Sequence, residues 1–144
     1  MKPVDPLHLT VPATLKDARA ATEQVVRLCE RLSVEERAHY ATAVMEWLVN
    51  VVKHSYAHRP EARIAIHAFA GTDGIELMVE DTGQGMEPSR FEAAPAEVRF
   101  DPADLDGLPE SGMGLAIIKS VMDTVHYQSE RGVNRLTATR RWRR

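Results

Sequence analysis

The segment from residue 44 to residue 53 constrains this chain most, because it predicts a helix that is apolar on almost every side. Its polar residues Glu46, Asn50 and Lys53 are spaced four and three residues apart, so they share one narrow face of the helix, which we call the polar stripe. A buried carboxylate, amide or ammonium group without a partner costs several kcal/mol. Two arrangements remain open: an internal Glu46–Lys53 ion pair with Asn50 bonded to the backbone, or a wet cleft that holds a ligand.

The residues around this helix predict the other elements. Ser33 and Glu36 form a Ser-x-x-Glu capping box, which begins a helix expected to run to about Tyr56. Thr14 is the expected N-cap of an earlier helix that ends near Leu32. The remaining expected elements are an edge strand at 7–11, strands at 62–70 and 75–80 joined by a turn at 71–74, a short helix near 89–92, a helix at 112–122, and strands at 124–130 and 134–140.

The order of these elements predicts the fold class. Two helices are followed by a hairpin, a long irregular stretch, a helix and a second hairpin, which is typical of a two-layer α+β sandwich with a mostly antiparallel sheet. We expect one domain over residues 1–144. The irregular stretch, at about 84–111, is rich in glycine and proline and is expected to be a functional lid.

Two glycine motifs flank that stretch. Asp81-x-Gly83-x-Gly85 follows a strand, where the aspartate is either a fixed acceptor for a ligand or an ordinary turn cap. The run 111–115, Ser-Gly-Met-Gly-Leu, opens a helix, where free backbone N–H groups favour an anion such as a phosphate chain; simple helix entry is the alternative. No Gly-Lys-Ser/Thr follows, and no strand precedes it, which excludes a Walker loop and a Rossmann fingerprint.

Composition narrows the classes of function. The net charge is −3, which gives no general basis for nucleic-acid binding, and the arginines at 140–144 are interpreted as a solvated strand end. The single cysteine, Cys29, allows no internal disulfide and is expected in the core. No apolar run reaches the length of a membrane span, so we expect a cytoplasmic protein without direct contact to membranes.

Taken together and in order, the stripe Glu46-x-x-x-Asn50 and the two glycine motifs resemble the N, G1 and G2 boxes of the GHKL ATPases. The resemblance narrows to the bacterial anti-sigma-factor serine/threonine-protein kinases, and it is carried by residues 46–56, 108–118 and 134–137. One position departs from the pattern of that family: Trp47 is bulkier than the small residue expected there. The resemblance implies a Bergerat-type sandwich, with a mixed sheet, helices on one face and a lid over ATP.

The resemblance also implies roles for individual residues. Glu46 would take the proton from an attacking serine hydroxyl, Asn50 would hold Mg²⁺ between the phosphates, and Asp81 would accept from the adenine amine. The nucleotide-binding set implied by the family comprises Asn50, Lys53, Asp81, Gly83, Gly85, Met86, Ser111, Gly112, Met113, Gly114, Leu115 and Thr137.

The family further implies protein partners. These are an anti-anti-sigma protein of the STAS type, whose serine is phosphorylated, and a sigma factor that is sequestered, with consequences for transcription. A homodimer is also implied, with Arg19, Glu23 and Arg27 on the first helix near its interface. Two other functions remain open: a nucleotide-dependent switch module with little or no phosphotransfer, and a fragment of an ATPase or histidine kinase.

Overall fold

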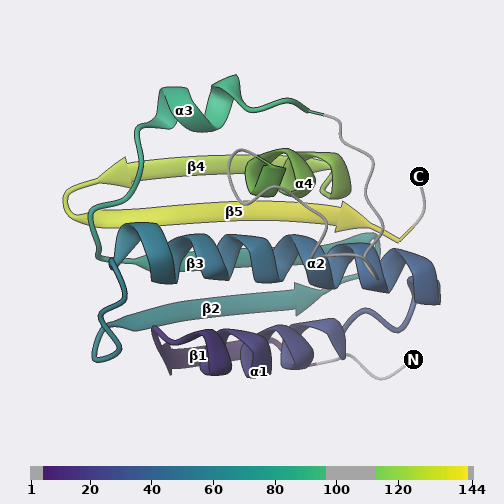
Figure 1. Cartoon of the computed structure of the whole chain (residues 1–144). Helices are drawn as coiled ribbons and strands as arrows, with labels where there is room; N and C mark the ends of the chain where they lie inside the picture. The colour runs from purple at the N-terminus through teal and green to yellow at the C-terminus, as the bar shows by residue number, and fades with distance from the viewer. Residues whose placement is uncertain (1–4, 97–112, 143–144) are drawn as a thin grey trace.

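The computed structural model describes residues 5–96 and 113–142, which form one five-stranded sheet with helices against it (Figure 1). The strands lie in the order β1-β2-β3-β5-β4, and every neighbouring pair is antiparallel. The sheet is therefore more uniform than the mixed sheet that the resemblance implied. The elements in chain order are β1 Leu7–Pro12, α1 Leu15–Val26, α2 Val34–Asn50, η1 Val51–Ser55, β2 Arg63–Ala70, β3 Gly74–Asp81, α3 Pro88–Ala93, α4 Met113–Val121, β4 Thr124–Glu130 and β5 Val133–Arg141.

One face of the sheet carries the core. Figure 1 shows α1, α2 and α4 in front of the strands, with α3 beyond the β4 edge. The strands alternate as expected, and Ile64, Leu77 and Leu136 are buried beneath the helices. The expected two-layer α+β sandwich is thus confirmed, with α2 as its central helix.

The helix boundaries differ from the expected ones in two places. α1 ends at Val26, and the chain then passes through tight turns in which the amides of Leu28 and Cys29 donate to carbonyls three residues back. Cys29 is still fully buried, because these turns keep it on the core side. α2 ends at Asn50, and a π-helical turn, η1, replaces the last α-helical turn.

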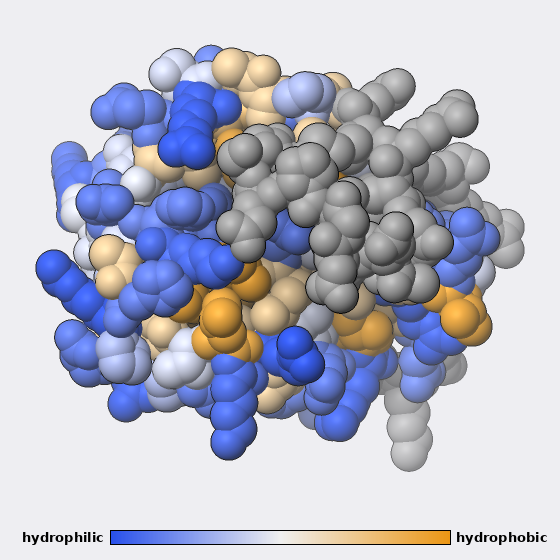
Figure 2. Space-filling model, viewed as in Figure 1, coloured by the Kyte–Doolittle hydropathy of each residue, from blue (hydrophilic) through white to orange (hydrophobic). Residues whose placement is uncertain are grey.

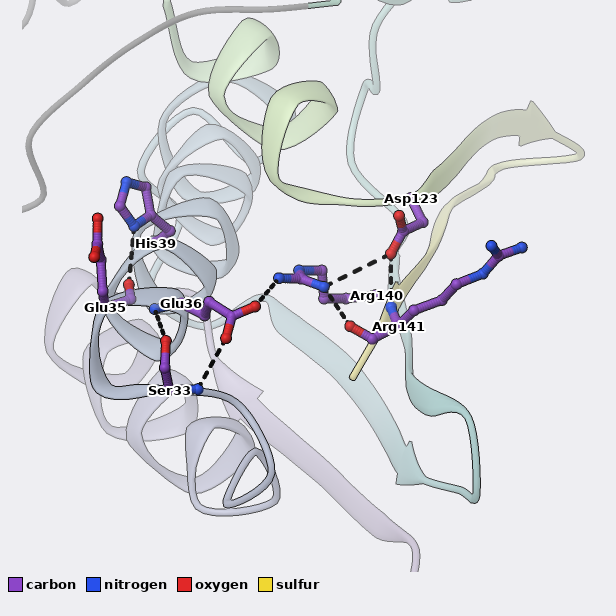
Figure 3. Close-up of polar contacts among 7 residues, drawn as sticks. All are labelled: Ser33, Glu35, Glu36, His39, Asp123, Arg140 and Arg141. Atoms are coloured by element: carbon purple, nitrogen blue, oxygen red, sulfur yellow. Dashed lines mark hydrogen bonds and ion pairs between the residues drawn. The ribbon is translucent and has the colours of Figure 1, made fainter. Parts of the chain in front are cut away.

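A polar cluster joins the start of α2 to the end of β5 (Figure 3). The predicted capping box is present: the amide of Ser33 donates to Glu36 and the amide of Glu36 donates to Ser33, both at 3.1 Å. The other carboxylate oxygen of Glu36 accepts from Arg140 at 2.6 Å, and Arg140 lies 3.9 Å from Asp123. The hydrogen bonds from Ser33 and the Arg140 guanidinium lower the pKa of Glu36. The cluster satisfies Arg140, whose side chain is only 4% exposed.

The coloured part of the helical face is mainly hydrophilic, with hydrophobic residues visible near the middle of the view and at its right edge (Figure 2). Within the described ranges, no helix combines the length and the apolar character needed to cross a bilayer.

Candidate nucleotide site

The polar stripe on α2 is half-buried. Glu46, Asn50 and Lys53 are all partly accessible on one line that runs from α2 into η1. In the described part of the chain, no ion pair joins Glu46 to Lys53, so the internal-pair arrangement is not found. Burial raises the pKa of Glu46, while the charge of Lys53 opposes that effect. A carboxylate with a raised pKa is a better proton acceptor, which is a property that a general base requires.

The start of α4 meets this stripe. A Cβ atom on Gly114 would lie 2.8 Å from Oε2 of Glu46, so a side chain at this position would displace the carboxylate. The first turn of α4, which includes Met113, therefore lies beside the carboxylate, where its backbone N–H groups favour an anion. Leu115 is half-buried and packs against the core. Ser111 and Gly112 lie outside the described residues.

Asp81 ends β3 on the helix-facing side of the sheet and is 4% exposed. Its Oδ1 accepts three hydrogen bonds: from the Ser55 hydroxyl, from the Gly83 amide at 3.0 Å and from Nδ2 of Asn134 at 2.7 Å. The Gly83 bond is the turn cap that the sequence allowed. Among the described residues, no hydrogen bond reaches Oδ2, so this oxygen is available to accept from a ligand.

The two glycines after Asp81 are required by close contacts. A Cβ atom on Gly83 would lie 2.3 Å from the Ser55 carbonyl oxygen, and one on Gly85 would lie 2.3 Å from Oδ1 of Asn134. Gly85 also has φ +68°, a backbone conformation that side chains disfavour. The motif is thereby held against η1, with the Gly85 amide donating to the Ser55 hydroxyl at 3.1 Å.

The first part of the expected lid is docked on the domain. The Met86 amide donates to the Tyr127 hydroxyl at 2.9 Å, and α3 follows directly. Phe91 of α3 packs beside Trp47 and Tyr127, with the Trp47 ring edge-to-face to both. The bulky Trp47 thus anchors α3 to α2. The remainder of the expected lid, from residue 97 on, lies outside the described residues.

Thr137 is the expected site residue that the fold does not bring to the others. It pairs with Met78 and His126 across the sheet, on the face opposite the helices. There it lines a hollow of about 430 Å³, which contains none of the other expected site residues. That hollow is therefore a surface separate from the Glu46–Asp81 site. The β5 residue beside Asp81 is Asn134, which is 2% exposed.

Sequence reasoning missed Ser55, Asn134 and Tyr127 as parts of the site. The alternation of β5 held the signal for Asn134, because residues 134, 136 and 138 share the inward face, whereas residue 137 faces outward. No comparable signal pointed to Ser55, because its position depends on the π-helical turn that precedes it.

The donor set fits a nucleotide with Mg²⁺. Asp81 has an acceptor oxygen that could pair with a base amine, the first turn of α4 could hold an anion, and Asn50, which lies between Glu46 and Ser55 in the chain, has an amide oxygen that could hold Mg²⁺. The described residues contain no group of three or more histidine, cysteine or acidic side chains that could hold a metal. Asn50 would hold Mg²⁺ through its amide oxygen, because Mg²⁺ prefers oxygen ligands.

Comparison with known proteins identifies the family of this chain. A family model described as a histidine kinase-like ATPase domain matches residues 10–140. The serine-protein kinase RsbW of Halalkalibacterium halodurans is 27% identical over 133 residues, which cover 88% of this chain and 78% of that protein. An anti-sigma F factor of Clostridium perfringens strain 13 is 30% identical over 99 residues, which cover 69% of this chain and 67% of the relative.

Solved structures share the fold. The RsbU and RsbW domains of a Mycobacterium tuberculosis protein align with a TM-score of 0.65 and 23% identity, covering 96% of this chain and 33% of that one. The mycobacterial sensor histidine kinase MprB aligns with a TM-score of 0.52 and 21% identity, covering 95% and 97% of the two chains. At these identities the likeness concerns the fold alone.

Proposed function

Because the chain belongs to the histidine kinase-like ATPase domain family, we propose that it binds Mg-ATP and phosphorylates a serine of a partner protein. The base would contact Asp81, and the phosphates would lie between the α2 stripe and the first turn of α4. Asn50 would hold Mg²⁺, which neutralises phosphate charge when bound, and Lys53 would lie near the phosphates. Gly83, Gly85 and Met86 would border the base and ribose.

In the transfer step, the serine hydroxyl oxygen forms a bond to the γ-phosphorus while the bond from the γ-phosphorus to the oxygen of ADP breaks. Glu46 accepts the hydroxyl proton. The backbone N–H groups at the start of α4 stabilise the charge that develops on the phosphoryl oxygens. These steps require positioning and charge neutralisation rather than a covalent intermediate on the protein.

The observation that carries this proposal is the approach of Glu46 to Gly114. A carboxylate with a raised pKa lies within contact distance of a helix start that favours phosphate. A module that only binds nucleotide has no need of a base at that point, which favours the kinase over the switch module.

The partners are proposed from the relatives. The similar proteins include serine-protein kinases and anti-sigma F factors, so we propose an anti-anti-sigma protein of the STAS type as the substrate and a sigma factor as the sequestered partner. We also propose a homodimer that uses the exposed side of α1, which carries Arg19 and Glu23, together with the exposed Arg27 that follows the helix.

The test combines capture and mass measurement. The tagged chain with Mg-ATP is used to capture partners from a cell lysate, and intact masses of the eluted proteins are recorded. We expect a small partner that gains one phosphate when the parent chain is used and gains none when Glu46→Gln is used. The control is Glu61→Gln, which changes an exposed glutamate outside the site and should give the same phosphate gain as the parent chain. Equal phosphate gain with Glu46→Gln would refute the role of Glu46. A partner that binds but never gains mass would favour the switch module.

A further inference from the structure

Three donors converge on a single oxygen of Asp81, and they come from different parts of the chain. Gly83 belongs to the same turn as Asp81, whereas Ser55 comes from η1 and Asn134 from β5. The Ser55 hydroxyl has one proton, and that proton is directed at Oδ1 while its oxygen accepts from the Gly85 amide. The position of this carboxylate is therefore set by tertiary structure as well as by its own turn.

Asn134 is held in one orientation. Its two Nδ2 hydrogens are used by Oδ1 of Asp81 at 2.7 Å and by the Gly83 carbonyl at 3.0 Å, while its Oδ1 accepts from the Ser129 hydroxyl at 2.6 Å. A flipped amide would bring its oxygen against the carboxylate and lose these bonds. Asn134 therefore presents donors to Asp81 and cannot exchange that role for an acceptor.

We propose that Ser55 and Asn134 are positioning residues that determine the base selectivity of the nucleotide site through Asp81. The terminal torsion of an aspartate is soft, so a single local hydrogen bond leaves the carboxylate plane poorly fixed. With Oδ1 held by three donors, only Oδ2 remains for a ligand. This inference rests on the proposed function, since it concerns how the base of a bound nucleotide is read.

A fixed carboxylate oxygen distinguishes bases by their hydrogen-bonding groups. A purine with an amino group at this point donates to Oδ2, whereas a purine with a carbonyl there brings two acceptors together and leaves both unpaired. Sites built to pair with one polar group discriminate strongly against analogues that lack it. If the hydrogen bonds from Ser55 and Asn134 to Oδ1 are removed, the carboxylate can rotate, and the discrimination between the two purines falls.

The experiment measures dissociation constants for Mg-ATP and Mg-ITP with the parent chain, Ser55→Ala, Asn134→Ala and the double variant. Inosine triphosphate carries a carbonyl in place of the adenine amine. The control is Thr124→Ala, which loses a side-chain hydrogen bond to Thr139 on the opposite face of the sheet. We expect the parent chain to prefer ATP over ITP. We expect this preference to be about tenfold smaller in Ser55→Ala and in Asn134→Ala, because each variant loses one hydrogen bond to the charged carboxylate of Asp81.

The ratio of the two constants separates a positioning role from a structural one. General loosening of the site weakens the binding of both nucleotides equally and leaves the ratio of their dissociation constants unchanged. An unchanged ratio in both Ser55→Ala and Asn134→Ala would therefore overturn this inference. If Asn134→Ala fails to fold, the ratio measured with Ser55→Ala still tests the inference, because this substitution removes only one hydroxyl group. A parent chain that binds neither nucleotide would overturn the proposed function and this inference with it, whereas a selective parent with equally selective variants would overturn the inference alone.

Discussion

Gly114→Ala should slow the proposed phosphoryl transfer without unfolding the protein. The added Cβ would lie 2.8 Å from Oε2 of Glu46, which is about 0.6 Å short of the 3.4 Å at which ordinary van der Waals contact begins. Oε2 is the end of a flexible side chain, so the carboxylate moves rather than the helix. Misplacement of a reacting group by about 1 Å costs about 10²-fold in rate, so a displacement of about half that size should cost about tenfold.

Stability and nucleotide binding should respond differently from the rate. Alanine favours a helix by up to about 1 kcal/mol over glycine, so the free energy of unfolding should stay level or rise slightly. ATP affinity should change little, because the backbone N–H groups at the start of α4 remain. The assay is single-turnover transfer to the captured partner, with ATP binding and urea unfolding measured on the same variant.

A second substitution tests the mechanism of this effect. Glu46→Asp shortens the side chain by one methylene group and withdraws the carboxylate from residue 114. If crowding causes the loss, Gly114→Ala should cost much less in the Glu46→Asp background than in the parent chain. A full parent rate for Gly114→Ala, or an identical penalty in both backgrounds, would refute the reasoning.

Three further substitutions or treatments test other parts of the structure. Glu36→Gln should lower the free energy of unfolding at neutral pH by about 0.5–1 kcal/mol through loss of the charged hydrogen bond from Arg140, because water screens the Glu36 carboxylate, which is 38% exposed. Because the pKa of Glu36 is lowered in the folded state, its contribution is complete above its ordinary value of 4.5 and is lost as the pH falls, so urea curves of parent and variant should converge in acid; a constant gap would contradict this. Cys29, fully buried with its pKa raised by burial to about 12, should resist iodoacetamide until the protein unfolds, and rapid labelling of the folded chain would contradict its placement. Gly85 has φ +68°, and the Cβ atom added by Gly85→Ala would lie 2.3 Å from Oδ1 of Asn134. We therefore expect this substitution to lower the free energy of unfolding by about 2–4 kcal/mol, measured by thermal unfolding, and an unchanged melting temperature would argue against that contact.

Local sequence rules accounted for most of the fold. The Ser33–Glu36 capping box, the 62–70 and 75–80 hairpin and the final hairpin are all present, because each depends on residues close together in the chain. The half-buried stripe on α2 is present for the same reason, since helical spacing alone places its members on one face.

The sequence by itself therefore determined the α+β sandwich, the buried central helix and its polar stripe, because these follow from the periodicity of apolar residues and from local capping. Three features were decided only by tertiary structure. The π-helical turn at 51–55 carries Ser55 to Asp81, the pairing of β3 with β5 places Asn134 rather than Thr137 beside that carboxylate, and the packing of α4 on α2 brings Gly114 against Glu46. Each joins segments far apart in the chain, and such contacts arise from how whole elements pack rather than from any local pattern of residues.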